Sequence, residues 1–156
     1  MRKINKQAGF TLIELIMVIV ILGVLSAFAL PRFADLGGNA RTASINGLAA
    51  SVRAAANIAH AQQLANGGDH DDDVTLEGQA ITMIGGYPTA NAAGIGLAAQ
   101  ILAADYGGTA GGGVALSAQI TYTLPNDGVG NCQAAYTAAT ATSATTFAVA
   151  IDTGGC

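Results

Sequence analysis

The chain has 156 residues and a formal net charge of −4 at pH 7, and only 10% of its residues are charged. Once a membrane-length apolar segment is set aside, the remainder suits one domain. The first six residues contain three of the six basic residues, Arg2, Lys3 and Lys6. Beyond them, three arginines stand against ten acids. This balance argues against nucleic acid as a specific partner.

An apolar run extends from Phe10 to Leu30, and only Thr11, Glu14 and Ser26 are polar within it. As a helix it would span about 31 Å, the thickness of the hydrocarbon core of a bilayer. A carboxylate in such a segment costs about 2.5–3.5 kcal/mol on insertion scales, so we expect Glu14 to have a function. By the positive-inside rule, the basic start of the chain stays cytoplasmic.

Two other interpretations of this region are available. A secretory signal peptide has an apolar region of about 7–15 residues with its cleavage site after it, and the run here is longer. A plain membrane anchor would leave unexplained both Glu14 and the Gly9-Phe10 sequence at which the apolar run begins.

After the apolar run, the sequence predicts a continuing helix. Pro31 predicts a kink or slight break. Residues 32–66 then place apolar side chains on one helix face, and Asn66-Gly67-Gly68 is a stop signal. We expect one long helix from Phe10 to about Ala65. The apolar face comprises Ile45, Leu48, Val52, Ala55 and Ala59.

The rest of the chain predicts short strands and loops, and so an α+β fold. Three consecutive strands near the C-terminus suggest an antiparallel meander with one face on the helix. The predicted elements, in chain order, are a loop at 69–73, β-prone pieces in 74–84, a turn at 85–89, a short helix at 91–104, a loop at 107–113, a strand from Val114 to Leu124, a turn at 125–128, and strands at 132–137 and 146–151.

The chain has two cysteines, Cys132 and Cys156. The domain after the apolar run would lie outside the cytoplasm, in an oxidising compartment, so we expect the two cysteines to form a disulfide. Two free buried thiols are the alternative. A redox or metal site is less favoured, because neither a second cysteine pair nor a histidine cluster accompanies them.

The first 30 residues resemble the N-terminus of type IV prepilins. In that family a short basic leader ends in Gly, the mature chain starts with Phe, and its fifth residue is Glu. The resemblance assigns residues 1–9 to a cleaved leader, 10–30 to a transmembrane and filament-core helix, and 31–156 to a periplasmic or extracellular head. It implies the type IV pilin fold, a long helix packed on a small antiparallel sheet.

The resemblance also implies site residues. Prepilin peptidase would cut between Gly9 and Phe10, and the amino group of Phe10 would be methylated. Glu14 has three interpretations that do not exclude one another. It reaches the cytoplasmic interface, it recruits the subunit to the assembly platform, or it pairs with the Phe10 amine of a neighbouring subunit. Pairing would fix axial register, because a buried acid without its partner is costly.

Within type IV pilins, the chain looks most like the mannose-sensitive haemagglutinin (MSHA) pilin. Three short passages carry this likeness: Pro31-Arg32-Phe33 with Leu36, Gly86-Tyr87-Pro88 leading to Gly94-Ile95, and Cys132 and Tyr136 with a terminal Cys156.

Other patterns in the chain predict little chemistry. Asp69, Asp71 and Asp73 are spaced like ligands of a calcium loop, but the Gly and Glu of an EF-hand do not follow, so a solvated acidic loop is favoured over a weak cation site. His60 and His70 have no nucleophile pattern nearby.

Two glycine-rich patterns also carry little weight. Gly94-x-Gly96-x-x-Ala99 matches a dinucleotide fingerprint without the βαβ context, and residues 107–113 lack the Lys and Ser/Thr of a P-loop. We expect no catalytic residues and no cofactor.

The resemblance implies a structural protein, the major subunit of an MSHA-like pilus used for attachment. The partners would be further copies of the chain in a helical filament, prepilin peptidase, an assembly ATPase, a platform protein and a secretin. The precursor would be a single-pass inner-membrane protein. A type II secretion pseudopilin is the near alternative, and a membrane-anchored periplasmic enzyme or binding protein is the distant one.

Overall fold

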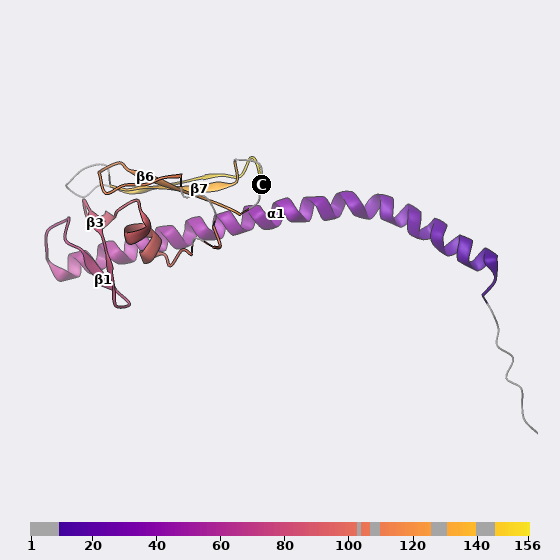
Figure 1. The fold of residues 1–156 in the computed structure, drawn as a ribbon, viewed down its shortest axis with the longest axis horizontal. Helices are drawn as coiled ribbons and strands as arrows, with labels where there is room; N and C mark the ends of the chain where they lie inside the picture. Colours follow the sequence, from indigo (N-terminus) through magenta and orange to yellow (C-terminus); the bar gives the residue numbers. More distant parts are fainter. Residues whose placement is uncertain (1–9, 103, 107–109, 126–130, 140–145) are drawn as a thin grey trace, which may run out of the picture. The chain divides into compact units, whose positions relative to one another are not determined.

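The computed structural model describes residues 10–102, 104–106, 110–125, 131–139 and 146–156. Its longest element is the helix α1, Leu12–Asn66. The chain divides into two compact units between Gly38 and Asn39, inside this helix. We call the described residues up to Gly38 the apolar segment, and Asn39–Cys156 the head. Figure 1 shows the course of the chain.

The long helix is confirmed, and its predicted apolar face is the one that is buried. Ile45, Leu48, Val52, Ala55 and Ala59 are each at most 7% exposed. The helix does not break at Pro31, so that part of the prediction is wrong: α1 continues through the proline. A proline removes one backbone N–H donor, and the hydrogen bonds of the neighbouring turns continue the helix on both sides of it.

The head begins with two small hairpins. β1 (Val74–Leu76) pairs antiparallel with β2 (Gln79–Ile81), and β3 (Met83–Ile84) pairs with β4 (Tyr87–Pro88). The expected turn at 85–89 is therefore shorter than predicted, since Tyr87 and Pro88 form a strand. Gly85 and Gly86 make the tight turn with positive φ angles of 55° and 88°, which glycine adopts without steric cost.

The predicted helix at 91–104 is present in a shorter form. A single π-helical turn, η1, spans Ala92–Gly96 and is capped by Asn91, whose side chain accepts the Gly94 N–H at 2.7 Å. The backbone here lies very close to Thr89, because a Cβ added to Gly94 would sit 2.3 Å from the Thr89 carbonyl oxygen. Only glycine allows that approach.

The main sheet has four antiparallel strands in the order β5-β6-β7-β8. They are β5 (Ala110–Gly111), β6 (Gln119–Thr123), β7 (Gln133–Thr137) and β8 (Ala148–Asp152). The expected meander is confirmed as β6, β7 and β8. The strand predicted from Val114 begins only at Gln119, since Ser117 has a φ of 61° that interrupts an extended chain.

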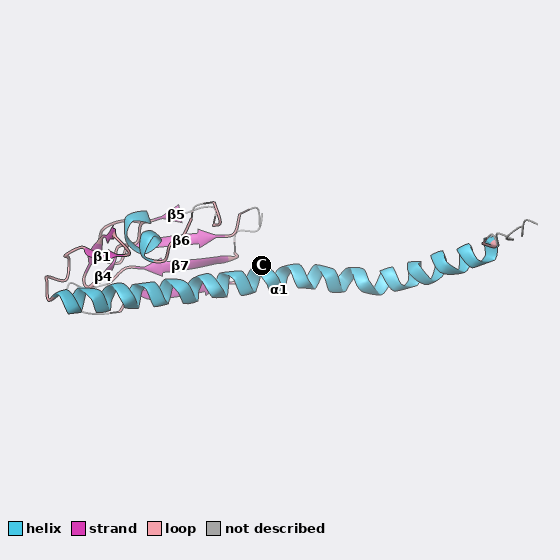
Figure 2. Cartoon of the chain, turned by 90° about the horizontal axis from the view of Figure 1, so that it is seen from below, coloured by secondary structure: helices cyan, strands magenta, loops and turns pink. Residues whose placement is uncertain are grey.

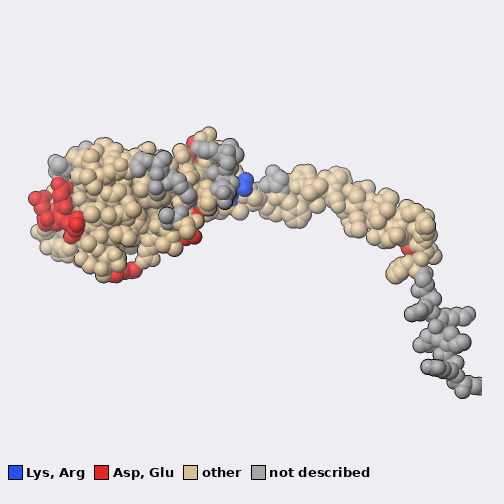
Figure 3. Space-filling model, viewed as in Figure 1, with Lys and Arg blue, Asp and Glu red and all other residues tan. Residues whose placement is uncertain are grey.

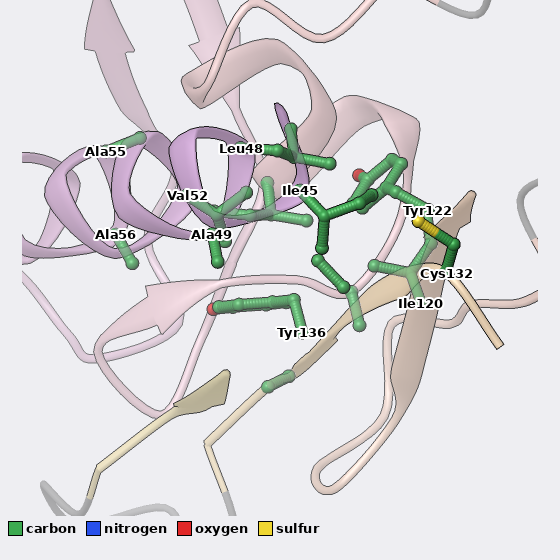
Figure 4. Close-up of a cluster of buried hydrophobic side chains, with 14 residues drawn as sticks. Ile45, Leu48, Ala49, Val52, Ala55, Ala56, Ile120, Tyr122, Cys132 and Tyr136 are labelled. Carbon is green, nitrogen blue, oxygen red and sulfur yellow. The ribbon is translucent and has the colours of Figure 1, made fainter. Parts of the chain in front are cut away.

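The core lies between α1 and this sheet. Ile45, Leu48 and Val52 of the helix point toward Ile120, Tyr122 and Tyr136 of the strands (Figure 4). Side chains of β6 alternate, with Ile120 and Tyr122 buried. Figure 2 shows the sheet stacked against the helix in the head, an α+β arrangement with the long N-terminal helix of the type IV pilin fold.

Candidate functional site

The apolar segment exposes nearly all of its large side chains. Ile13, Val20 and Leu25 are 61%, 58% and 59% exposed, and Phe10 is 95% exposed. α1 is long and apolar enough to cross a membrane, and none of the relevant stretch is buried within the chain. A contiguous apolar surface of this size marks a site for lipid or for other proteins.

The start of α1 is a capping box built by Thr11 and Glu14. The Thr11 backbone N–H and hydroxyl donate to Glu14 Oε2 at 2.9 and 2.8 Å. The Glu14 N–H donates in return to Thr11 Oγ1, at 3.4 Å. Such a box satisfies donors that every helix start leaves open. The acid that the sequence singled out is therefore bonded within its own helix.

A second polar group of the segment is satisfied in the same way. The Ser26 hydroxyl donates to the Leu22 carbonyl oxygen at 2.7 Å. The hydroxyl thus presents no unpaired donor to an apolar surrounding, which lowers the cost of placing it there. Of the two residues at the predicted cleavage junction, Gly9 lies outside the described residues and Phe10 is described.

The acidic loop uses its carboxylates to hold backbone. Asp71 Oδ1 accepts the Gly85 N–H at 2.7 Å, and Asp72 Oδ2 accepts the Asp69 N–H at 2.8 Å. Asp69 accepts from His70, and Asp73 from Met83. Figure 3 shows acidic side chains gathered at one end of the head. Within the described parts of the chain, no three His, Cys, Asp or Glu side chains form a group that could hold a metal ion.

Gln63 organises this loop, and the sequence analysis missed it. It is 3% exposed, and its Nε2 donates to the carbonyl oxygens of Asp69 and His70, at 3.1 and 2.7 Å, and to that of Asp72. His60 contacts the same region, with Nδ1 2.7 Å from the Gly86 carbonyl oxygen and its ring stacked on Tyr87. A glutamine three residues before the helix end was the available signal, since it lies where helix carbonyls and the following loop converge.

The C-terminal strand is anchored at three points. Cys132 and Cys156 are joined in a disulfide. Arg41 Nε donates to the main-chain oxygen of Cys156 at 2.6 Å, and Arg53 Nη2 donates to that of Val149 at 2.9 Å. The two arginines of the head thus join α1 to β8 and to the residues after it. Their partners were not predictable from spacing, because more than 90 residues separate each pair.

Two buried tyrosines differ in their hydroxyl partners. Tyr136 donates to the Pro88 carbonyl oxygen at 2.7 Å. The Tyr122 hydroxyl is buried without a hydrogen-bond partner among the described residues. Burial raises the pKa of Tyr122 to about 12. Burial, with the nearby Tyr87 and Tyr122, also raises the pKa of Tyr136. Both rings therefore stay neutral at physiological pH.

The glycine pattern at Gly94, Gly96 and Ala99 has a structural explanation. Gly94 and Gly96 belong to the π-helical turn η1, whose N-cap side chain occupies the Gly94 N–H. The turn is five residues long and no parallel strand leads into it. This geometry differs from the helix start that receives a dinucleotide pyrophosphate.

Comparison with known proteins gives one family motif. Residues 4–30 match the prokaryotic N-terminal methylation motif. No solved structure matches the chain. The matched residues contain the Gly9-Phe10 junction and Glu14, so the motif coincides with the segment described above.

Several known proteins are similar to part of the chain. The type IV narrow pilus major component PilA5 of Thermus thermophilus is 56% identical over 57 residues, 36% of this chain and 49% of that protein. The type IV major fimbrial protein FimA of Dichelobacter nodosus is 35% identical over 96 residues, 57% and 58% of the two chains. Core protein G of the Vibrio cholerae type II secretion system is 53% identical over 32 residues, which are 20% of this chain and 22% of that protein.

The motif and these relatives make part of the chain similar to members of the type IV pilin family. The proteins of this family are structural subunits and not enzymes. The chain matches less than two thirds of the length of each of these relatives.

Proposed function

We propose that the chain is the major structural subunit of a type IV pilus, of the MSHA-like kind, and that the filament serves surface attachment. The observation that carries this proposal is the exposed apolar segment, opened by the Thr11–Glu14 capping box and matched by the methylation motif. A surface of this kind suits a bilayer before assembly and the helices of neighbouring subunits afterwards. The MSHA-like assignment rests on the three short motifs that follow the apolar run.

The proposed mechanism starts with processing. Residues 1–9 are the leader, residues 10–30 the membrane and filament-core helix, and residues 31–156 the periplasmic or extracellular part. Cleavage after Gly9 creates a new amine on Phe10, which is then methylated. Phe10 is 95% exposed just before the helix, so the described part of the chain does not cover the residue that would carry the amine.

Glu14 then links processing to assembly. Its Oε2 already accepts hydrogen bonds from Thr11, so part of the hydrogen-bonding capacity of the carboxylate is used while the subunit is in the membrane, before assembly. In the filament, the Phe10 amine of a neighbour supplies the cation. Uncleaved precursor has no amine at this position and is excluded. The pair fixes axial register, because a misplaced subunit would leave one charge buried without a partner.

The partners follow from this role. The precursor is a single-pass inner-membrane protein with a cytoplasmic N-terminus, and prepilin peptidase acts on it there. An assembly ATPase, a platform protein and an outer-membrane secretin move it into the extracellular filament.

A second candidate function is that of a pseudopilin in a type II secretion system, which the likeness to core protein G favours. Electron microscopy of cells with and without the gene separates the two. Long surface filaments that disappear with the gene support a major pilin, whereas loss of protein secretion without loss of filaments supports a pseudopilin.

The mechanism is tested with Glu14→Val and Glu14→Gln. Glutamine keeps the acceptor that a capping box requires and removes only the charge. We expect both variants to be cleaved and to accumulate, with sheared filaments strongly reduced relative to total processed subunit. Wild-type filament yield from Glu14→Gln would show that the charge pair does not control assembly.

The processing step is tested by mass analysis of the N-terminal peptide of sheared filaments, which should begin at methylated Phe10. Met1 in assembled filaments would contradict it. Gly9→Val should leave uncleaved precursor in the inner membrane.

A further inference from the structure

One flank of the head carries an apolar groove. A cavity of about 800 Å³ lies between α1 and residues 96–102, and a smaller one of about 380 Å³ adjoins it. Three large apolar side chains of the groove, Ile58, Leu97 and Leu102, are 58%, 42% and 64% exposed. Such side chains around a hollow offer a surface that another molecule can cover.

The groove is bordered by acids. Glu77 lies on the larger cavity, where Gln100 Nε2 donates to its Oε2, and Asp105 lies on the smaller one. Both residues are exposed to solvent. Among the described residues that line the two cavities there is no arginine or lysine.

The basic residues of the head lie at the other edge of its sheet. Arg41 and Arg53 are the only Lys or Arg after Asn39 in the sequence. Arg53 donates to Val149 in β8 and Arg41 to Cys156 just after it, and both side chains are exposed. Each uses one guanidinium nitrogen for that contact, while a guanidinium has five N–H donors. We call β8, Arg41 and Arg53 the β8 flank.

The groove and the β8 flank belong to opposite sides of the head. β5 and β8 are the two edge strands of the sheet. Ala90, just before η1, bridges to Gly113, just after β5, so the chain leading to residues 96–102 lies on the β5 side. Figure 2 shows β5 beside β6, at the edge of the sheet away from β7. Asp152 is the acid of β8, and its Oδ1 accepts the Gly154 N–H.

We propose that the acidic apolar groove of one subunit receives the β8 flank of a second copy of this chain. Charge complementarity favours this occupant, since the acids of the groove meet the two arginines that the head possesses. Groove against groove would bring like charges together. Because the two surfaces differ, the contact is heterologous, and a heterologous contact builds an open filament when its rotation does not close into a ring. The inference rests on the proposed polymerising function and names the surfaces by which heads would meet.

The first test is charge reversal. Asp105→Arg and Arg53→Glu should each lower sheared-filament yield about tenfold, because like charges then face one another. The double variant should recover to within about twofold of the wild-type yield. Asp72→Arg combined with Arg53→Glu is the matched control and should not recover, because Asp72 lies in the acidic loop, away from the groove. Normal yield from Asp105→Arg would overturn the proposal.

The second test covers the outcome in which Arg53→Glu merely loosens β8. Leu102→Cys and Ala150→Cys are combined in one subunit, and assembled filaments are treated with a short thiol crosslinker. A ladder of covalent multimers is expected, and the pair Leu102→Cys with Ile58→Cys, both in the groove, should give none. Absence of the ladder in filaments of normal yield would overturn the proposal.

Failure of the proposed function looks different from either result, since then the unmodified chain would form no surface filaments.

Discussion

The two parts of α1 meet different surroundings. In the head, Ile45, Leu48 and Val52 are at most 4% exposed because the sheet covers them. In the apolar segment, Ile13, Ile19 and Leu25 are at least 57% exposed although the same helix carries them. The helix therefore buries one stretch against its own chain and leaves the other for a different molecule. Folding of the head and occupation of the apolar segment are separable events.

The largest effect should come from Ile45→Ala in the head. Removing a fully buried isoleucine leaves a cavity and costs about 4 kcal/mol. Ile19→Ala, whose side chain is 57% exposed, should leave head stability unchanged. Thermal unfolding of the processed subunit in detergent, followed by near-UV circular dichroism, measures both. Equal destabilisation by the two variants would contradict the separation of the regions.

Loss of the disulfide should come next. Cys156→Ser, best combined with Cys132→Ser, should destabilise the head by about 2–4 kcal/mol, because the unfolded chain regains loop entropy. Processing at Gly9 should be unaffected. Urea unfolding and the ratio of cleaved to uncleaved subunit are the two measurements, and reduced cleavage with intact head stability would be the contrary outcome.

Tyr136→Phe should cost about 1–2 kcal/mol, because it leaves the buried Pro88 carbonyl oxygen without its hydrogen bond. Tyr122→Phe removes a hydroxyl that has no partner in the described part of the head, so it should be neutral or slightly stabilising. Urea unfolding at pH 7 compares the pair. A Tyr122→Phe variant as unstable as Tyr136→Phe would show that the hydroxyl has a role.

The smallest effect appears only in alkali. The pKa of Tyr122 is about 12 in the folded head, against the ordinary value of 10.0, so the folded state holds its proton more tightly. Its contribution to stability is complete below pH 10 and is lost as pH rises from 10 to 12. Tyr122→Phe should reduce this alkaline loss, as unfolding midpoints at pH 9 and 11 would reveal. An unchanged pH dependence would exclude ionisation of Tyr122 as its source.

The sequence predicted the parts of the fold in which apolar residues recur at a regular spacing. The buried face of α1 was readable because Ile45, Leu48 and Val52 recur at helical spacing, and β6 because Ile120 and Tyr122 alternate. Other parts depend on tertiary contacts. Val114 and Leu116 continue the alternation in phase, but the Gly113 N–H bonds to Ala90 and the Ser117 N–H bonds to Ala139, so the strand begins later.

The same distinction between local spacing and tertiary contacts applies to the candidate site. Glu14 stood out because an acid is rare in an apolar run, and its bond to Thr11 follows from a spacing of three residues. The contacts of Gln63, Arg41 and Arg53 were missed, since nothing in the local sequence reveals which distant carbonyl oxygen a side chain will reach. The groove was missed as well, because it forms only where α1 and residues 96–102 come together.

The disulfide between Cys132 and Cys156 also determines whether a subunit cut by a protease stays in one piece. Cys132 directly precedes β7 and Cys156 follows β8, so the covalent link closes a loop containing both strands. A protease that cuts this loop once leaves two pieces that remain joined. The chain after the cut, β8 included, stays attached to its own head. In a polymer, one such nick would shorten no filament and release no fragment.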